Sequence, residues 1–392
     1  MMHLFLNALA ASAGGGLTYL RNVVARLSAR DDVRTTAAVN PTLGQELQEL
    51  PNVSYLEFKT PANTTLRFWQ EQTALPEVVR RSGAQVLISS GNFALRKCPV
   101  PQILLSRNSL YTSADFYHDV RARRDYGIWV DTRLKAILAK RSIQWADCTV
   151  APSEAFAAEL RRWSGGNVVF IHHGFDRHTF FGSDDPLPVA VQQKLDDAQD
   201  SLRLLFVSHY NYYRNFETLL RALPVLRERL RGRRIKLFLT CKLHTEANPG
   251  SYRADVVSAL VRQLGIGEQV VELGTVPYHL LHHVYRQCHI YVTPAYAESF
   301  AHPLVESMAS GLPVVASDLS VHREICGDAA LFFHRFSPIE LAGQVLRLAS
   351  SDALMADLSQ RGLRKSQEFS WRQHVDQITS LAQTLLSSAK AA

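Results

Sequence analysis

Residues Thr293 to Ser317 read TPAYAESFAHPLVESMASGLPVVAS, and this stretch decides the fold of the second half of the chain. Its pattern predicts the end of a strand, a loop, a short helix over about 303–310, a glycine stop and a second strand. Pro303 suits the first helical position, where its missing N–H costs nothing, and Gly311 ends the helix sharply. The stretch is therefore a strand, helix and strand unit.

The start of this short helix is a predicted receptor for an anion. Its first turn leaves backbone N–H groups unpaired at Phe300, Ala301 and His302, and together with the helix dipole these groups favour a diphosphate. Two acids flank the turn, because Glu298 lies in the preceding loop and Glu306 about one turn inside the helix. Both acids can face one ligand, so the site fits a nucleotide diphosphate that carries hydroxyl-rich groups.

The segment ESFAHPLVE, continued by SMASGLPVVAS, resembles the Glu-x7-Glu motif of retaining, nucleotide-sugar-dependent glycosyltransferases of the GT-B fold, a family 4-like group. Two glutamates at this spacing are common on solvated helices. Here, however, the phenylalanine, the proline, the glycine stop and the apolar strand follow in the family's order. The resemblance implies that Glu306 binds the paired hydroxyls of the donor ribose and that Glu298 lies beside the transferred sugar.

The same resemblance groups four further residues with the donor, namely Ser299, Phe300, Ala301 and Leu304. One of them departs from the family pattern. Ala301 stands where the family usually has glycine, and an alanine there restricts close approach of the backbone to the sugar or phosphate.

Length and composition indicate a globular chain of two ordinary domains. The chain has 392 residues, of which 46% are hydrophobic and 20% charged. Its formal net charge of +7 suits an anionic substrate or an anionic membrane surface. No zinc-finger, basic-zipper or aromatic-lined basic stripe is present in the sequence, so we expect no nucleic acid partner.

The five cysteines are scattered without a C-x-x-C pair, which predicts core thiols in a reducing compartment. The opening MMHLFLNALAASAGGG lacks a basic first segment, so we expect a strand running into a glycine loop rather than a secretory signal. The sequence has no run of 18 apolar residues. We therefore expect a cytoplasmic protein, at most peripheral to the inner face of the membrane.

Strand and helix patterns alternate along the chain, which predicts parallel sheets built from βαβ units. The predicted strands cover about 3–8, 35–39, 53–58, 85–89 and 102–106 in the first half, and 202–207, 237–240, 270–275 and the two strands of the opening stretch in the second. The polar, proline-bearing stretch 182–200 is interpreted as the linker between the two halves.

Two places in the first half are acceptor-side or phosphate-side candidates. A run of three glycines follows the first strand and opens a helix over 17–28. A tight turn explains it as well as a ligand does, and the resemblance assigns Gly15 and Gly16 to the cleft as donor-binding residues. Arg107 and Asn108 follow a strand, at the edge where open α/β sheets bind ligands. Arg107 takes the place of a family histidine, and an ordinary surface arginine is an equal alternative.

The stretch 121–141 carries seven basic residues interspersed with apolar ones. This pattern is typical of a helix that contacts anionic lipid, although a solvated helix face is the commoner explanation of a basic run. A peripheral membrane contact through 121–141 is therefore one expectation and a purely solvated face the other.

The loop after the first strand of the second half, SHYNYYRN, resembles the family's diphosphate clamp. Arg214 fits the second cation of that clamp, whereas His209 stands where the family has arginine and is charged only when protonated. The segment GTVP resembles the one that packs against the nucleotide base, which points to Thr275 and Val276; a plain turn is the alternative. The histidine cluster at 279–289 lacks metal-ligand spacing, so its members are expected to face solvent.

These observations predict an α/β protein of GT-B architecture, with two Rossmann-like domains facing a cleft and a C-terminal helix that returns to the first. The expected limits are 1–185, 186–370 and 371–392. The resemblance implies retaining glycosyl transfer from a nucleotide sugar to a glycan, lipid-linked or small-molecule acceptor. It implies no metal and no cofactor, with Glu298, Arg214 and His209 as catalytic residues. A nucleotide-sugar-binding subunit without turnover and a GT-B sugar epimerase are the alternatives.

Overall fold

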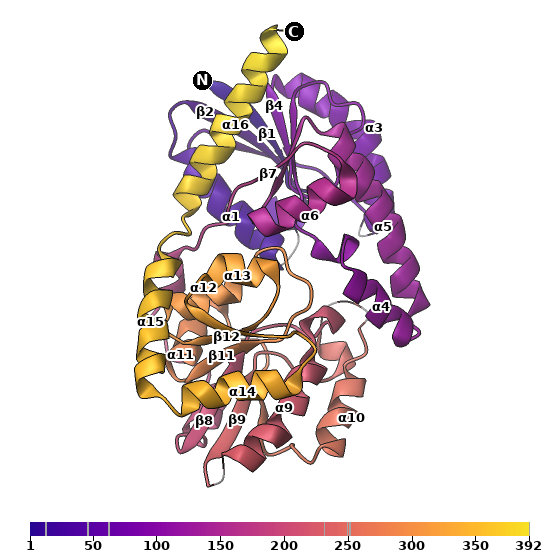
Figure 1. The fold of residues 1–392 in the computed structure, drawn as a ribbon. Coiled ribbons are helices and arrows are strands. Elements are labelled where there is room, and N and C mark those ends of the chain that lie inside the picture. Colours follow the sequence, from indigo (N-terminus) through magenta and orange to yellow (C-terminus); the bar gives the residue numbers. More distant parts are fainter. Residues whose placement is uncertain are drawn as a thin grey trace. The chain divides into compact units, whose positions relative to one another are not determined.

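A computed structural model describes residues 1–11, 14–44, 47–61, 63–230, 232–248, 250 and 252–391 (Figure 1). By its contacts the chain separates into two compact units. The first comprises Met1–Thr112, Val130–Gly174 and Ser370–Ala392, and the second comprises Ser113–Trp129 and Phe175–Phe369. Each unit contains one parallel sheet with helices packed on it, as the alternating pattern of the sequence predicts.

The first unit is built on seven parallel strands in the order β3-β2-β1-β4-β5-β6-β7. The strands are β1 Met2–Asn7, β2 Val33–Val39, β3 Val53–Glu57, β4 Val86–Ser89, β5 Gln102–Leu105, β6 Cys148–Ala151 and β7 Val168–Phe170. The helices are α1 Gly14–Ser28, α2 Pro41–Gly44, α3 Thr64–Ser82, most of α5 Tyr126–Trp145, α6 Glu154–Ser164 and α16 Trp371–Ala391, with the short turn η1 Ser109–Tyr111.

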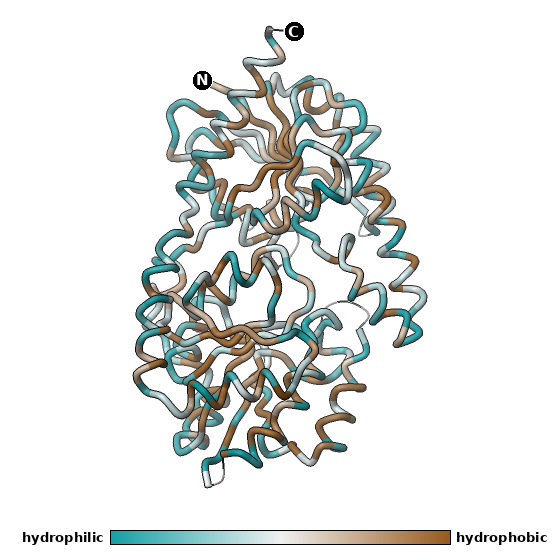
Figure 2. The backbone as a smooth tube through the Cα atoms, viewed as in Figure 1, coloured by the Kyte–Doolittle hydropathy of each residue, from teal (hydrophilic) through white to brown (hydrophobic). Residues whose placement is uncertain are grey.

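Successive residues of β1 pack on opposite faces of this sheet, as the two-residue period of a strand requires. Leu4 and Leu6 belong to the core shared with α1 and α16, whereas Phe5 packs with residues of α3. Figure 2 shows the apolar residues concentrated along the strands of both sheets. Both faces of the sheet are thus covered by helices, which is why its strands read as nearly continuous apolar runs.

The C-terminal helix α16 packs on the first unit, as the fold prediction requires. His374 of α16 lies 2.9 Å from the Tyr19 hydroxyl on α1, and its Nδ1 lies 2.8 Å from the backbone oxygen of His172. Gly174 lies against the start of this helix, where an added Cβ would be 2.0 Å from the Trp371 nitrogen. Only glycine fits that contact, so the segment His172-His173-Gly174 is fixed by the returning helix.

The second unit is built on six parallel strands in the order β10-β9-β8-β11-β12-β13. The strands are β8 Ser201–Phe206, β9 Arg234–Leu239, β10 Val270–Glu272, β11 Ile290–Thr293, β12 Val314–Ser317 and β13 Ala330–Phe333. The helices are α4 Ala114–Ala122, α7 Arg177–Phe181, α8 Val189–Asp196, α9 Phe216–Arg229, α10 Asp255–Gln263, α11 Leu281–Arg286, α12 His302–Ala309, α13 Ser320–Cys326, α14 Pro338–Ala349 and α15 Asp352–Ser366, with the turns η2 Tyr212–Arg214, η3 Thr245–Ala247 and η4 Tyr278–Leu280.

The structure groups two segments differently from the sequence interpretation. The stretch 182–200 contains the helix α8, because Val191 and Leu195 lie one turn apart and are both buried. The segment Ser113–Trp129 belongs to the second unit, since Arg123 pairs there with Glu217 at 2.6 Å. Local apolar packing therefore explains the helix α8, whereas an ion pair between residues distant in sequence ties 113–129 to the second unit. No helix within the described ranges is long and apolar enough to cross a membrane.

Candidate active site

The order of strands in the second sheet creates a place where ligands bind. The chain moves outward in one direction from β8 through β9 to β10, and then in the other from β11 through β12 to β13, so β8 and β11 are neighbours at the point of reversal. The loops that follow such a pair diverge at their carboxyl ends and leave a crevice. These two loops carry the predicted clamp residue Arg214 and the predicted acid Glu298.

Arg214 and Glu298 form an ion pair with each other. Both side chains are largely buried, with relative exposures of 20% for the arginine and 12% for the glutamate. Burial alone would raise the pKa of Glu298, but the Arg214 guanidinium, the nearby His322 and the Ser299 N–H outweigh it and lower that pKa. Glu298 is therefore ionised at neutral pH, and the sequence prediction that both residues belong to one site is consistent with this contact.

Glu306 lies in a different environment from Glu298. It is buried inside α12, and its carboxylate accepts a hydrogen bond of 2.9 Å from the Tyr285 hydroxyl on α11. Burial raises its pKa to about 7, although the Tyr285 hydrogen bond acts in the opposite direction. A carboxyl group that titrates near neutrality accepts hydroxyl hydrogen bonds best above that pH.

The backbone turns sharply where α12 begins. The helix covers His302–Ala309, one residue earlier than predicted, with proline in its first turn. Ala301 has φ +67° and ψ +67°, in the left-handed region that glycine favours. The family's glycine at this position therefore has a backbone reason, and Ala301 keeps the same turn at a cost of about 1–2 kcal/mol.

The other predicted residues around α12 have side chains committed to packing. The Phe300 ring lies 4.9 Å from the His302 ring and 5.5 Å from the Phe369 ring, measured between centroids. Leu304 is fully buried. Any contact that these residues make with a ligand is therefore through the backbone. Ser299 is half-buried, and its N–H donates to the Glu298 carboxylate at 3.2 Å.

Two further predictions for the second unit concern its loops. His209 lies on the same loop as Arg214 and is exposed, so its ring is accessible to a ligand. Thr275 is exposed and Val276 buried, directly after Gly274, whose φ of +78° turns the chain beyond β10. The base-packing role of this segment stays a prediction.

The acceptor-side candidates come together in the first unit. An added Cβ on Gly16 would lie 3.9 Å from Nη2 of Arg107, so the first turn of α1 and the end of β5 meet. Arg107 donates to the Ser90 oxygen at 2.7 Å, and its guanidinium carbon lies 4.9 Å from the centre of the Tyr19 ring. Arg107 is thus a packed residue rather than an ordinary surface arginine.

The remaining candidates of the first unit lie beside these. Gly15 is in the first turn of α1, while Ser12 and Ala13 of the predicted glycine loop lie outside the described residues. Asn108 caps η1 by accepting the Leu110 N–H at 3.0 Å, which is a structural role.

The expectation that the histidines of 279–289 face solvent is wrong for His282. Its ring is 1% exposed and lies against Phe180 and Phe181. His289 is half-buried, and its Nδ1 accepts the Arg203 N–H at 3.0 Å. Within the described ranges, no group of three or more histidine, cysteine or acidic residues is arranged to hold a metal ion.

Two residues beside the candidate site had no signal in the sequence. Tyr285 reaches Glu306 from a neighbouring helix, and His322 lies near Glu298 from the helix after β12. Neither belongs to the motif that identifies the glutamates. Only the packing of α11 and α13 against the loops brings them there, so residue spacing along the chain could not have found them.

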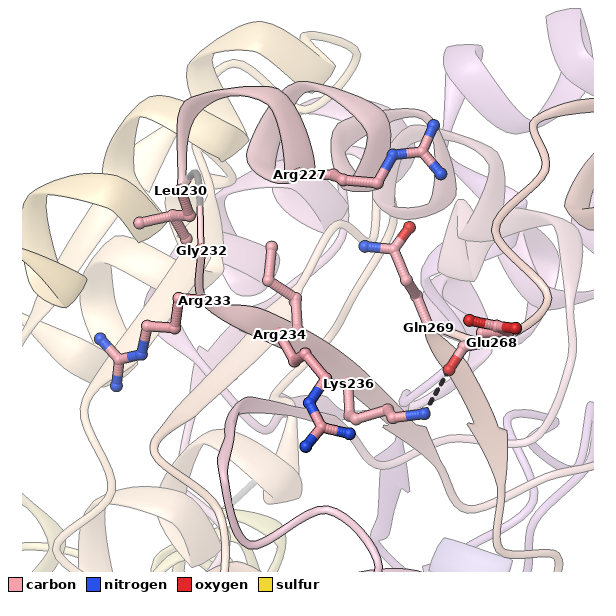
Figure 3. Close-up of a pocket in the computed structure, with 9 residues that line it drawn as sticks. Arg227, Leu230, Gly232, Arg233, Arg234, Lys236, Glu268 and Gln269 are labelled. Atoms are coloured by element: carbon pink, nitrogen blue, oxygen red, sulfur yellow. Dashed lines mark hydrogen bonds between the residues drawn. The ribbon is translucent and has the colours of Figure 1, made fainter.

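A basic pocket of about 350 Å³ lies near the amino end of β9, whereas the candidate site lies at the carboxyl ends of the strands. Figure 3 shows that its cationic side chains point in different directions, and that Lys236 is held by the backbone oxygen of Glu268. Arg227 donates to the Gly265 oxygen at 3.1 Å. Cationic side chains that point away from one another do not bind one anion together, so this pocket is not a candidate functional site.

Two family models match the chain side by side. Residues 190–365 match the model described as "Glycosyl transferases group 1", and residues 13–179 match "Glycosyltransferase Family 4". Together the two models cover most of the chain, which belongs to the family 4-like glycosyltransferases of the GT-B fold. The second of these matches falls mostly in the first unit and the first falls entirely in the second unit.

Individual relatives of this family 4-like protein agree with the fold. A D-inositol 3-phosphate glycosyltransferase of Corynebacterium aurimucosum is 26% identical over 256 residues, which are 64% of this chain and 60% of that protein. A sucrose-phosphate synthase of Thermosynechococcus elongatus superimposes with a TM-score of 0.78 at 18% identity, covering 99% of this chain and 100% of that one. Anabaena HepE, solved with UDP-glucose, gives 0.69 at 14% identity over 100% of both chains. The matched region spans less than two thirds of the Corynebacterium protein.

The raised pKa of Glu306 predicts a pH-dependent stability. The protonated carboxyl favours the folded state, so its contribution is fully present below about pH 4.5 and is lost as pH rises through about 7. Glu306→Gln removes this dependence. The variant should match the parent near pH 4.5 and exceed its free energy of unfolding by an amount on the order of 3 kcal/mol at pH 8.

Urea unfolding of the parent and variant at pH 5 and pH 8 measures this difference, with the exposed Glu228→Gln as the matched control. A constant difference between the two proteins at both pH values would show that Glu306 titrates normally.

Proposed function

We propose that this chain transfers a sugar from a nucleotide diphosphate sugar to a hydroxyl of a glycan, a lipid-linked glycan or a small molecule, with retention at the anomeric carbon. The observation that carries the proposal is the largely buried Arg214 and Glu298 pair at the switch point of the second sheet, together with the buried Glu306 on α12. Arg214 can bind the diphosphate, and Glu298 and Glu306 can each face one of the two hydroxyl-rich groups that it carries.

The state of Arg214 supports a phosphate ligand. Its Nε–H is buried and has no hydrogen-bond partner among the residues that the structure describes. A buried donor without a partner is costly, and a phosphate oxygen would satisfy it. The guanidinium presents several donors in a rigid fork, which suits phosphate better than a single ammonium would. We assign Arg214 to the leaving diphosphate.

In the proposed reaction, the bond between the anomeric carbon and the phosphate oxygen breaks, and its electron pair leaves with the diphosphate. The acceptor hydroxyl attacks from the same face, and its proton passes to the departing phosphate oxygen. Arg214 and His209 stabilise the charge that develops, so no metal or cofactor is proposed. Glu298 stands beside the sugar as positive charge develops there, and Glu306 binds the ribose hydroxyls.

The proposed donor belongs to the nucleotide diphosphate sugars. The Anabaena neighbour was solved with UDP and with UDP-glucose, which makes uridine nucleotide sugars the first candidates here. The inositol phosphate glycosyltransferase among the relatives makes a phosphorylated polyol a reasonable small acceptor to include. Arg107, beside Gly16 in the first unit, is the proposed acceptor-side cation.

A turnover experiment tests the function. UDP, GDP, TDP and CDP sugars are screened for a rise in melting temperature, since a ligand of the native state stabilises it. Consumption of the stabilising donor is then measured with and without excess EDTA. We expect turnover that survives EDTA, is reduced by about 100-fold or more in Arg214→Ala and is partly restored in Arg214→Lys.

Arg221→Ala, on the exposed face of α9, is the control. Stabilisation without any donor consumption would indicate a binding subunit. Turnover that EDTA abolishes and Mn²⁺ restores would reject the metal-free mechanism.

We further propose that α5 contacts an anionic membrane surface, where a lipid-linked acceptor would be presented. Three large apolar residues, Val130, Leu134 and Ile137, are 48%, 58% and 59% exposed and fall on one face of the helix by their spacing. Arg133 and Arg141 are exposed on the same side. An exposed apolar stripe bordered by arginines has the pattern of a helix that lies in a lipid interface.

Vesicle binding tests this surface. Leu134→Ser with Ile137→Ser should reduce sedimentation with vesicles of anionic lipid by about tenfold, because each buried methylene contributes about 0.8 kcal/mol to partitioning. Val256→Ser with Ile339→Ser, which removes two exposed apolar residues of the second unit, is the matched control. Equal binding by both double variants, or equal binding to neutral and anionic vesicles, would reject the contact.

A further inference from the structure

His322 is an unusual residue for its position on α13. Its side chain is fully buried, and Nδ1 lies 3.0 Å from the Ser317 hydroxyl and 3.1 Å from the Ser317 carbonyl oxygen. Nε2 is also buried and has no hydrogen-bond partner within the described part of the chain. Nδ1 therefore has two polar partners, whereas Nε2 has none among the described residues.

The hydrogen-bond network fixes which nitrogen carries the proton. The Ser317 hydroxyl donates to the backbone oxygen of Ala295, so its own proton is already committed. A carbonyl oxygen only accepts, and hence Nδ1 of His322 must be the donor to Ser317. Burial lowers the pKa of His322 to about 4, even though the Glu298 carboxylate acts to raise it. The ring is thus neutral at physiological pH, with its lone pair on Nε2.

This neutral ring is connected to the loop that carries Glu298. The connection runs from His322 on α13 to Ser317 at the end of β12, and from Ser317 to Ala295 in the loop after β11. Ala295 precedes Glu298 by three residues in that loop. Three successive elements are therefore tied together by hydrogen bonds, and the last of them holds the acid.

Nε2 has no hydrogen-bond partner within the described part of the chain, so the histidine contributes through Nδ1. An apolar side chain of similar size would fill the same space without burying an unsatisfied acceptor, which costs about 1–3 kcal/mol. The Nδ1–H bond to Ser317 is a hydrogen bond that a leucine at this position could not make. The donor on Nδ1, rather than the volume of the ring, is what this site requires.

We infer that His322 is a positioning residue for sugar transfer, which holds the Glu298 loop in its working geometry through Ser317. The inference rests on the proposed function, since it assigns a role to Glu298 in that reaction. His322 does not touch the substrate. Its effect is to keep a buried carboxylate at the place where the transferred sugar develops charge, and small displacements there are costly to the rate.

Two substitutions separate the donor from the ring. His322→Asn places an amide N–H where Nδ1–H lies and removes Nε2, whereas His322→Leu removes both nitrogens and keeps an apolar side chain. We expect the leucine variant to lower kcat by about tenfold or more while changing the affinity for bare nucleoside diphosphate by less than about twofold. The asparagine variant should keep kcat within about threefold of the parent.

Ser317→Ala interrupts the same connection at its centre and provides a test that leaves the histidine in place. It should lower kcat as His322→Leu does, and the double variant should be no slower than either single one, because the two residues act in series. Melting temperatures of all variants are measured alongside, and should a leucine variant fail to fold, Ser317→Ala against His322→Asn decides the question.

Additive losses in the double variant, equal losses in the asparagine and leucine variants, or a parallel loss of nucleotide affinity would each overturn the inference. A parent protein that binds but does not turn over any donor would reject the proposed function and the inference with it. A fully active parent together with a fully active His322→Leu would reject the inference alone.

Discussion

The buried ion pair between Arg214 and Glu298 is the interaction on which the candidate site depends. Removing two charges from water costs several kcal/mol for each ion, and the cost is repaid only when the geometry is good and the remaining donors are satisfied. Arg214 keeps an unsatisfied Nε–H in this state, so the pair is incomplete by itself. In the proposed function, an oxygen of the donor diphosphate would supply the missing acceptor to the Arg214 Nε–H.

The two glutamates of the motif lie in different surroundings. Glu298 has a cation beside it and a lowered pKa, whereas Glu306 has a tyrosine hydroxyl and a pKa raised to about 7. Different environments for paired carboxyl groups are a common way for one site to assign two roles. Here the ionised acid lies in the loop, near the position proposed for the transferred sugar, and the nearly neutral one is fixed inside a helix, near the position proposed for the ribose.

Local features of the site could be predicted from the sequence, since they depend on neighbouring residues. The helix α12 was expected within one residue of its observed limits, because proline and glycine mark both of its ends. The strands β1 to β5 and β8 to β12 were expected from their apolar runs, whereas β13 was not predicted. The family's preference for glycine at the place of Ala301 suggested a limit on close backbone approach, and the structure shows a positive φ there as a second reason for glycine.

Contacts across the sheet could not be predicted in the same way. Arg214 and Glu298 are separated by 84 residues and meet only because β8 and β11 are neighbours. Tyr285 contacts Glu306 and His322 lies near Glu298, and both come from helices whose packing has no sequence motif. The helix α8 was missed because prolines and acids around it suggested a linker, while two buried apolar residues one turn apart were enough to fold it.

The most direct test of this account is whether Arg214 receives the second phosphate. Calorimetry compares a nucleoside diphosphate with the corresponding monophosphate on the parent protein and on Arg214→Ala. The account predicts that the parent binds the diphosphate at least about tenfold more tightly, and that this preference disappears in the variant, since a hydrogen-bonded charge contributes about 1.5–3 kcal/mol. A diphosphate preference of the same size in both proteins would contradict it.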